Sequence, residues 1–156
     1  CSLVGSEMCI RDRILAHPFP VIAACGGHAI AQGAFVLLAC DVRLGGDAPV
    51  KVGLNEVAIG LTIPHYGVEV ARHQLVPPWF DHATVTGTLY DAAGALRAGF
   101  FHELVAPESL AGAAQARAER LAAVDMTAHA GTKLRTRRPV LEAIAEMHGP
   151  EFELPE

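Results

Sequence analysis

The sequence predicts an α/β fold, on three observations. Residues 21–25 form a continuous apolar segment, as expected for a strand covered on both faces. The pair Gly26-Gly27 and a turn from His28 to Gln32 then separate this strand from an apolar helix over about Gly33–Cys40. Apolar residues make up 51% of the 156 positions, enough for a sizeable core. Alternation of buried strands with helices is typical of α/β domains.

The elements on either side continue this alternation. Residues 14–20 contain two prolines and predict an extended approach to the first strand. After the first helix we expect a short strand over Asp41–Leu44 and a turn over Gly45–Asp47. A further strand, Val50–Leu54, then ends at the polar pair Asn55-Glu56.

Helices dominate the remainder. Pro64 is expected to open a helix whose inner face is Val68, Ala71 and Leu75 and which stops at Pro77-Pro78. Further helical segments are expected over Trp79–Thr86, ending at Gly87, and after the N-cap Asp91, ending at Gly99; they are followed by a strand, Phe101–Val105.

The C-terminal third predicts a helical region over 107–148, with 14–106 as the core. A helix over about Pro107–Val124 has Leu110, Ala114, Ala118 and Leu121 at near-heptad spacing. Residues 127–138 are helical by pattern, and Pro139 either kinks this helix or starts a new one. We expect residues 149–156 to be a frayed tail and residues 1–13 to be a non-native leader.

Composition excludes several classes of protein. The net charge of −5 is spread along the chain, which argues against a nucleic-acid partner. The longest uncharged apolar run, Phe19–Cys40, is interrupted by glycines, His28 and Gln32, which argues against a membrane span. The four cysteines, Cys1, Cys9, Cys25 and Cys40, form no C-x-x-C pair. We therefore expect them to be reduced and the protein to be located in the cytoplasm.

Several motifs in order resemble the crotonase superfamily of enoyl-CoA hydratases and isomerases. They are P-V-I-A-A-C-G-G-H-A-I-A-Q-G-A, a C-D pair, V-G-L-N-E-V-A-I-G-L-T-I-P and D-A-A-G-A-L-R-A-G-F-F-H-E-L-V, within 14–147. The resemblance implies a superhelical core of strand-strand-helix turns followed by C-terminal helices that pack on a partner in a homotrimer or dimer of trimers. It also implies an acyl-CoA thioester as substrate and no separate cofactor.

The resemblance assigns a site as well. It implies that the backbone N–H of Gln32 is one of two oxyanion donors and that Glu56 is a catalytic carboxylate, with Ile30, Ala31, Asn55 and His65 beside the substrate. The family usually has glycine at position 32, so the glutamine side chain must point away from the donor. Hydratases of the family have a first catalytic glutamate at the position of Phe35, and its loss favours double-bond isomerisation over hydration. The family's domain is also longer at its N-terminal end, so we expect this chain to lack the first oxyanion donor.

Without the resemblance, local sequence leaves other interpretations open. Glu56 could cap a helix or pair with Lys51 at the surface, and the Gln32 turn could be a tight connection with no ligand. The basic cluster Lys133, Arg135, Arg137 and Arg138 could approach the phosphates of CoA or form a solvated helix face. A non-catalytic acyl-CoA-binding subunit is the alternative to an enzyme.

Metal and nucleophilic chemistry are disfavoured. The eight histidines show neither H-x-H nor H-E-x-x-H spacing, so no metal site is expected. There is no G-x-S-x-G elbow, and Cys25 lies in a predicted strand, not at an exposed electropositive position. His65, near the predicted pocket, could assist a proton relay or could be a helix-start histidine.

Overall fold

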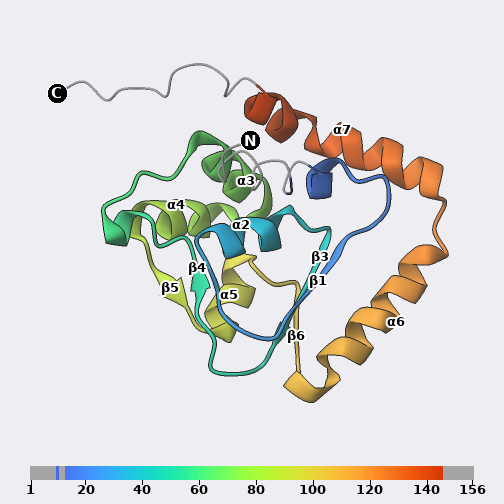
Figure 1. Cartoon of the computed structure of the whole chain (residues 1–156), viewed down its shortest axis with the longest axis horizontal. Helices are drawn as coiled ribbons and strands as arrows, with labels where there is room; N and C mark the ends of the chain where they lie inside the picture. The colour runs from blue at the N-terminus through green and yellow to red at the C-terminus, as the bar shows by residue number, and fades with distance from the viewer. Residues whose placement is uncertain (1–9, 11–12, 146–156) are drawn as a thin grey trace.

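A computed structural model describes residue 10 and residues 13–145, and within them the predicted α/β alternation is confirmed (Figure 1). The leader expected over 1–13 and the tail expected over 149–156 lie almost entirely outside the described residues. The elements are β1 (Ile22–Cys25), β2 (Ala29–Ile30), α2 (Gln32–Ala39), β3 (Val42–Gly46), β4 (Val52–Gly53), the 3₁₀ turn η1 (Val57–Ile59), α3 (His65–Gln74), α4 (Pro77–Thr86), β5 (Leu89–Tyr90), α5 (Ala92–Ala98), β6 (Glu103–Val105), the 3₁₀ turn η2 (Pro107–Ser109), α6 (Leu110–Ala122) and α7 (Met126–Ala145).

Two small sheets organise the chain. One has the order β1-β3-β6 with all neighbours parallel, and the other has the order β2-β4-β5, in which β2 and β4 are parallel and β5 is antiparallel. Successive strand pairs are each followed by a helix: β1, β2 and α2, then β3, β4 and α3. These two turns each add one strand to each sheet, which is the strand-strand-helix repeat that the family resemblance implies.

Strand β1 is present, but the expectation that both of its faces are covered is wrong. Its residues are half-buried or exposed, with Ala24 exposed, whereas Arg43 to Gly46 of β3 are buried. The reason is position: β1 is at the edge of its sheet and pairs only with β3 among the described strands. Apolar composition predicted a strand correctly but could not give its place in the sheet.

Several predicted boundaries shift by a few residues. Residues 29–30, expected in a turn, form β2, and α2 begins at Gln32. Gly45 and Gly46 belong to β3, and the strand expected over 50–54 shortens to β4. Pro64 is the N-cap of α3, which ends before Leu75, and Pro77-Pro78 begin α4 instead of ending α3. Strand β5 was not predicted, while the Asp91 cap and the ends at Gly87 and Gly99 are confirmed.

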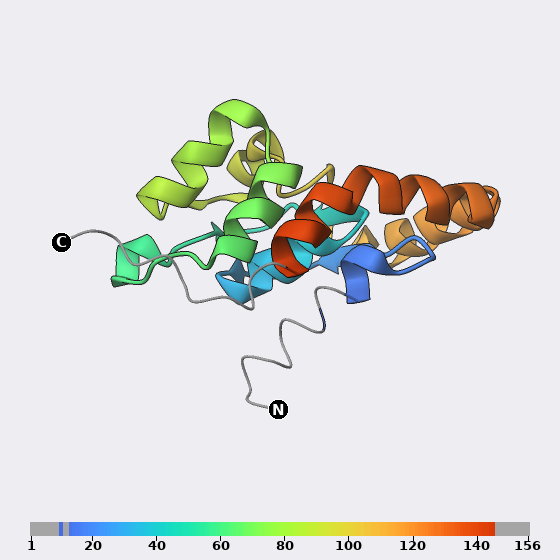
Figure 2. The same cartoon turned by 90° about the horizontal axis from the view of Figure 1, so that it is seen from above.

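The core lies between the sheets and α2, α3 and α5. Phe35, Leu38, Val52, Val70 and Phe100 are completely buried there. Figure 2, seen from above, shows α7 running from one end of the molecule to near its middle; it packs against α3, and α6 contacts β1 and β3. Within the described residues, no helix is both long enough and apolar enough to cross a membrane.

The C-terminal helices differ in how firmly they pack. Of the near-heptad positions in α6, only Leu110 is buried, so most of that helix faces outward. Helix α7 continues through Pro139 without a break, which settles the two alternatives in favour of a single helix. Val140 and Ile144, just beyond the proline, are 2% and 6% exposed, and this burial holds the helix together where one backbone donor is missing.

Candidate active site

The predicted site residues follow two strands that are hydrogen-bonded to each other. Ile30 of β2 is paired in parallel with Gly53 of β4, and the Ala31 N–H donates to the Gly53 carbonyl at 3.0 Å. Gln32 therefore leaves β2, and Glu56 leaves β4, at the same carboxyl edge. In open parallel sheets this edge is where ligands bind.

The turn between β2 and α2 is shaped by Ala31. This residue has φ 52° and ψ −118°, close to the first central position of a type II′ turn, where glycine is favoured. Its carbonyl accepts from the N–H groups of Ala34 and Phe35 at 2.9 and 3.1 Å, so the first intrahelical bonds start there. Gln32, as the first helical residue, has an N–H with no acceptor inside the helix. Such a donor at a helix N-terminus suits an anionic oxygen.

The side chain of Gln32 is directed toward α3. Its Nε2 donates to the Oη of Tyr66 at 2.7 Å, and both side chains are partly or wholly buried. The sequence required this side chain to point away from the backbone donor but gave no anchor for it. Tyr66, the second residue of α3, was missed because nothing in the sequence pairs it with a residue 34 positions earlier.

Glu56 is a buried carboxylate. The residue is 6% exposed, and its Oε2 is buried with no hydrogen-bond partner among the described residues. Its side chain makes no capping bond to η1, and no ion pair in the described chain joins it to Lys51, so the surface interpretations are wrong. Burial raises the pKa of Glu56 above its ordinary value, and a backbone hydrogen bond opposes this in part. A carboxylate of this kind is a better base than an exposed one.

Neighbouring positions complete this edge. The Oδ1 of Asn55 is buried and also lacks a partner within the described residues, and Ile30 and Ala31 are half-buried. His65 is exposed at the start of α3. Phe35 is completely buried and meets Tyr66 edge to face, with ring centroids 5.8 Å apart. An aromatic contact thus stands where a hydratase of the resembled family has its other carboxylate.

An apolar groove begins at the residue after Glu56. It has a volume of about 600 Å³ and lies among η1, α3 and α4. Val57, Leu61 and Val85 line it and are 46%, 56% and 67% exposed. The guanidinium of Arg72 lies over the Phe80 ring at its rim, 4.4 Å from the centroid.

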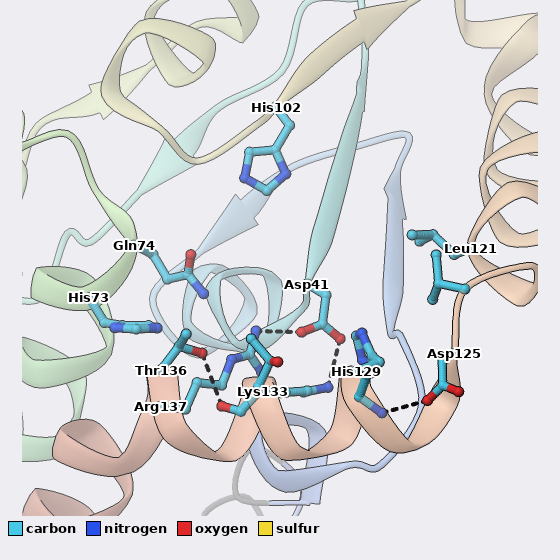
Figure 3. Close-up of a pocket in the computed structure, with 13 residues that line it drawn as sticks. Asp41, His73, Gln74, His102, Leu121, Asp125, His129, Lys133, Thr136 and Arg137 are labelled. Carbon is cyan, nitrogen blue, oxygen red and sulfur yellow. Dashed lines mark hydrogen bonds and ion pairs between the residues drawn. The ribbon is translucent and has the colours of Figure 1, made fainter.

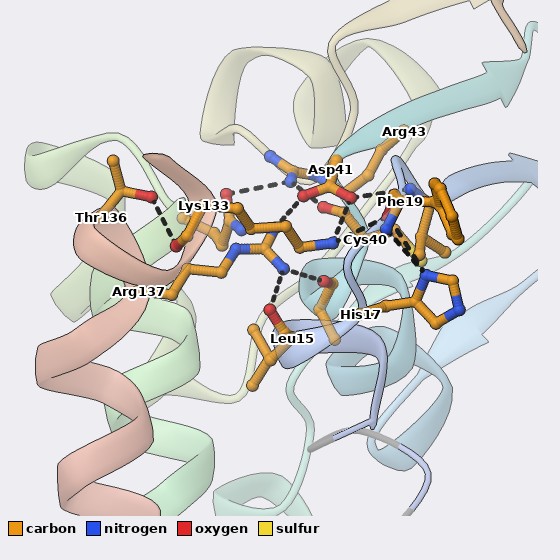
Figure 4. A network of polar contacts seen from close by, with 12 residues as sticks. Leu15, His17, Phe19, Cys40, Asp41, Arg43, Lys133, Thr136 and Arg137 are labelled. Carbon is orange, nitrogen blue, oxygen red and sulfur yellow. Dashed lines mark hydrogen bonds and ion pairs between the residues drawn. The ribbon is translucent and has the colours of Figure 1, made fainter. Parts of the chain in front are cut away.

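A second cavity, of about 580 Å³, lies beside α7, between this helix and residues such as His73, His102 and Leu121 (Figure 3). Asp41 accepts from Lys133 at 2.6 Å and pairs with Arg137 at 2.8 Å, and both cations are about 95% buried. Figure 4 shows the same cations reaching main-chain carbonyls: Lys133 that of Phe19, and Arg137 those of Leu15 and Ala39.

Both sequence interpretations of the basic cluster are therefore wrong for Lys133 and Arg137. Each is engaged by Asp41 and by carbonyl oxygens and is neither solvated nor free to bind phosphate. Only Arg135 and Arg138 of the cluster are exposed. The C-D pair at 40–41 was recognised as a motif, but its role as counterion to α7 follows only from the fold.

Arg43, on β3, ties this region together. It is 1% exposed and donates to the carbonyls of Phe100, Cys40 and Gly99 and to Gln74, and it contacts His102. Burial is the main reason that its pKa falls to about 10. Burial and the positive charges of Arg43 and Arg117 lower the pKa of His102 to about 4.

No group of three or more His, Cys, Asp or Glu residues in the described part of the chain is arranged to hold a metal ion. Cys25 is half-buried, with its Sγ donating to the Gly27 carbonyl, and Cys40 is buried. The described residues bring a buried carboxylate and a helix N-terminus to one edge of a sheet.

Comparison with known proteins identifies the family and the fold. The family model "Enoyl-CoA hydratase/isomerase" matches residues 8–148. The Mycobacterium tuberculosis protein named "Probable enoyl-CoA hydratase EchA17" is 34% identical over 109 residues, which is 70% of this chain and 41% of that protein. A crystal structure of an enoyl-CoA hydratase/isomerase family protein from Pseudomonas syringae is 43% identical, with a TM-score of 0.89, over 92% of this chain and 63% of that one. The apo structure of an enoyl-CoA isomerase of M. tuberculosis is 38% identical, with a TM-score of 0.88, over the same shares.

The chain spans about two fifths of the length of the curated relatives that it matches. The match nevertheless includes the edge that carries Gln32 and Glu56, together with the C-terminal helices. The chain therefore belongs to the enoyl-CoA hydratase/isomerase family of the crotonase superfamily.

Proposed function

We propose that the whole protein moves the double bond of an enoyl-CoA thioester, with Glu56 as the group that carries the proton. The observation that carries this proposal is the buried carboxylate of Glu56, whose Oε2 has no hydrogen-bond partner within the described residues and which follows the strand paired with β2, where the Ala31-Gln32 turn begins. An oxygen that accepts a proton from carbon must be free of other partners and shielded from water, and Oε2 of Glu56 meets both conditions.

In the proposed reaction, Glu56 removes a proton from the carbon between the thioester and the double bond of a 3-enoyl-CoA. The electrons of the broken C–H bond delocalise onto the thioester oxygen, giving a dienolate. The Gln32 N–H donates to that oxygen as its charge develops, which is when such a donor contributes most. Protonated Glu56 then returns the proton to the far carbon of the conjugated system, and the product is the 2-enoyl-CoA.

Isomerisation is preferred to hydration because one carboxylate is enough for it. Hydration by two cooperating carboxylates would need a second one, and the corresponding position holds the buried Phe35. Hydration remains the second candidate because relatives are named as hydratases. Assembly as a homotrimer stays a prediction that rests on the family resemblance.

The test is carried out on the protein expressed from its complete coding sequence. Mixed with trans-3-hexenoyl-CoA in deuterium oxide, it should form the conjugated 2-enoyl product and incorporate solvent deuterium. Glu56→Gln should lower kcat by about a hundredfold to ten-thousandfold, the usual contribution of a positioned general base. The exposed Glu108→Gln is the matched control and should react like the wild type.

The pH profile adds a second criterion. Activity requires ionised Glu56, so kcat/KM should rise with pH, with a midpoint above the 4.5 of an ordinary glutamate because burial raises this pKa. Deuterium incorporation that survives Glu56→Gln would refute the proposal. Binding of the CoA thioester without exchange in the wild type would establish the non-catalytic subunit instead.

A further inference from the structure

We propose that Tyr66 is a positioning residue: its hydroxyl holds the Gln32 side chain away from the backbone donor that receives the thioester oxygen. The proposal rests on the proposed function, because it concerns the same oxyanion site. The anchoring explains how the turn tolerates a glutamine at position 32, next to Ala31, whose backbone angles are those that glycine favours.

A glutamine at the first position of a helix threatens an oxyanion site. Its amide oxygen is a good acceptor, and the first N–H groups of the helix are unpaired donors within its reach. Glutamine and glutamate side chains in the first turn of a helix do bond to backbone N–H groups at its N-terminus, as in the capping box. If the Gln32 oxygen turned onto these donors, the thioester oxygen would have to displace it at every turnover.

Tyr66 removes this competition by fixing the amide elsewhere. The Gln32 Nε2 donates to Tyr66 Oη at 2.7 Å, and because the amide group is planar, fixing its nitrogen also fixes its oxygen. Tyr66 itself is 5% exposed and packs edge to face on the completely buried Phe35. Gly67, the next residue, has no room for a side chain, since an added Cβ would lie 2.6 Å from the Phe35 ring. Packing against Phe35 therefore fixes the position of the Tyr66 ring.

The test compares Tyr66→Phe with Tyr66→Phe/Gln32→Gly, using trans-3-hexenoyl-CoA and the full-length protein. An anchoring hydrogen bond of ordinary strength corresponds to about a three- to tenfold change, so Tyr66→Phe should lower kcat by about that factor. KM should change by less than about twofold, because the oxygen gains its charge only in the transition state. The double variant, which has no side chain to anchor, should recover to within about twofold of the wild type.

The only other tyrosine of the chain provides the matched control. Tyr90 is 7% exposed, and its hydroxyl bonds to His82 at 2.6 Å, away from the turn. Tyr90→Phe removes the same atom from an equally buried ring and should leave kcat within about twofold. Thermal unfolding of all four proteins identifies any variant that fails to fold.

A second readout separates this proposal from the proposed function. In the complex with carbonyl-labelled hexanoyl-CoA, infrared spectroscopy reports how strongly the oxyanion site polarises the thioester. The shift of the carbonyl band on binding should be smaller in Tyr66→Phe than in the wild type. In the double variant this shift should regain its wild-type size. If the wild type shows no isomerisation but this pattern holds, only the proposed function fails. A double variant as impaired as Tyr66→Phe, or a Tyr66→Phe variant that matches the wild type in both readouts, overturns the anchoring role.

Discussion

At the scale of the single residue, Ala31 combines a strained backbone with a position beside the proposed oxyanion donor. Its φ of 52° is the only positive value of a non-glycine residue in the described chain. Such conformations cost of order 1–3 kcal/mol and persist where the surroundings fix them. Here the fixing contacts are the Ala31 N–H bond to Gly53 and the two N–H groups that converge on the Ala31 carbonyl.

Ala31→Gly should therefore stabilise the protein, because glycine adopts these angles without strain. Subtracting the entropy that glycine loses on folding leaves an expected gain of about 1 kcal/mol in the free energy of unfolding. Urea denaturation measures it. Ala24→Gly in the exposed part of β1 is the control and should cost about 0.5–1 kcal/mol. If Ala31→Gly destabilises to the same degree, the turn is not strained.

The positions of single residues could be predicted where the order of strands determines them. Gln32 and Glu56 follow the paired strands β2 and β4, as their motifs indicate, whereas the catalytic roles taken from the family resemblance stay predictions. The burial of Glu56 could not be derived from local sequence, since its neighbours Val57, Ile59 and Leu61 are themselves exposed. The Gln32–Tyr66 bond could not be foreseen either, because it joins two turns of the chain that only the fold brings together.

At the scale of the element, helix α7 is attached to the core through one carboxylate. Asp41, at the start of β3, accepts from the Val21 N–H and pairs with both Lys133 and Arg137. The two cations also reach carbonyls of the segment before β1, so α7, β3 and that segment share one network (Figure 4).

Asp41→Asn should destabilise the protein by about 3–5 kcal/mol, because it leaves two buried cations without their counterion. Amide hydrogen exchange should accelerate along 126–145 more than in β3. The control is Glu103→Gln. Glu103 and its partner Arg117 are 46% and 30% exposed, so their ion pair should contribute no more than about 1 kcal/mol to the free energy of unfolding. A loss in Asp41→Asn no larger than in the control would show that the buried network does not hold α7.

Element prediction failed where tertiary contacts override local signals. Pro77-Pro78 predict the end of a helix, yet proline also fits the first turn of a helix, and here the pair begins α4. The basic residues of α7 predict a solvated face or a contact with CoA phosphates, because the carboxylate that engages Lys133 lies 92 residues away in the sequence. Strand β5 has only two residues, too few to show an alternating apolar pattern in the sequence, and it is defined by its pairing with β4.

At the scale of the whole molecule, the repeat of two strands and a helix places the site. Each of the first two repeats adds a strand to both sheets, so the chain after β2 and the chain after β4 emerge side by side. The family resemblance implied this repeat. The edge position of β1 was not predicted, because apolar composition indicates that a strand is buried but not where in its sheet the strand lies.

Ionisable groups whose pKa values change on folding give the stability of the protein a pH dependence of mixed sign. The pKa of Glu56 is raised on folding, so its contribution favours the folded state at low pH and is lost as pH rises. The pKa of His102 is lowered from 6.5 to about 4, mainly by burial and then by Arg43 and Arg117, and the pKa of His73 is lowered in the same direction. These histidines contribute stability above pH 6.5 that is lost as pH falls, because the unfolded chain takes up protons that the fold excludes.

His102→Asn should therefore flatten the loss of stability between pH 6.5 and about 4, since it removes one of the two histidines and leaves the opposite effect of Glu56 in place. Urea denaturation at a series of pH values across this window measures the slope. His17→Asn, at an exposed histidine outside the cavity beside α7, should keep the wild-type slope. Replacing His102 also removes its contact with Arg43, so the variant should be less stable at pH 7 even though it is less sensitive to acid. An unchanged slope in His102→Asn would mean that this imidazole is protonated in the folded protein as readily as in the unfolded one, contrary to its contact with Arg43 and the nearby charge of Arg117.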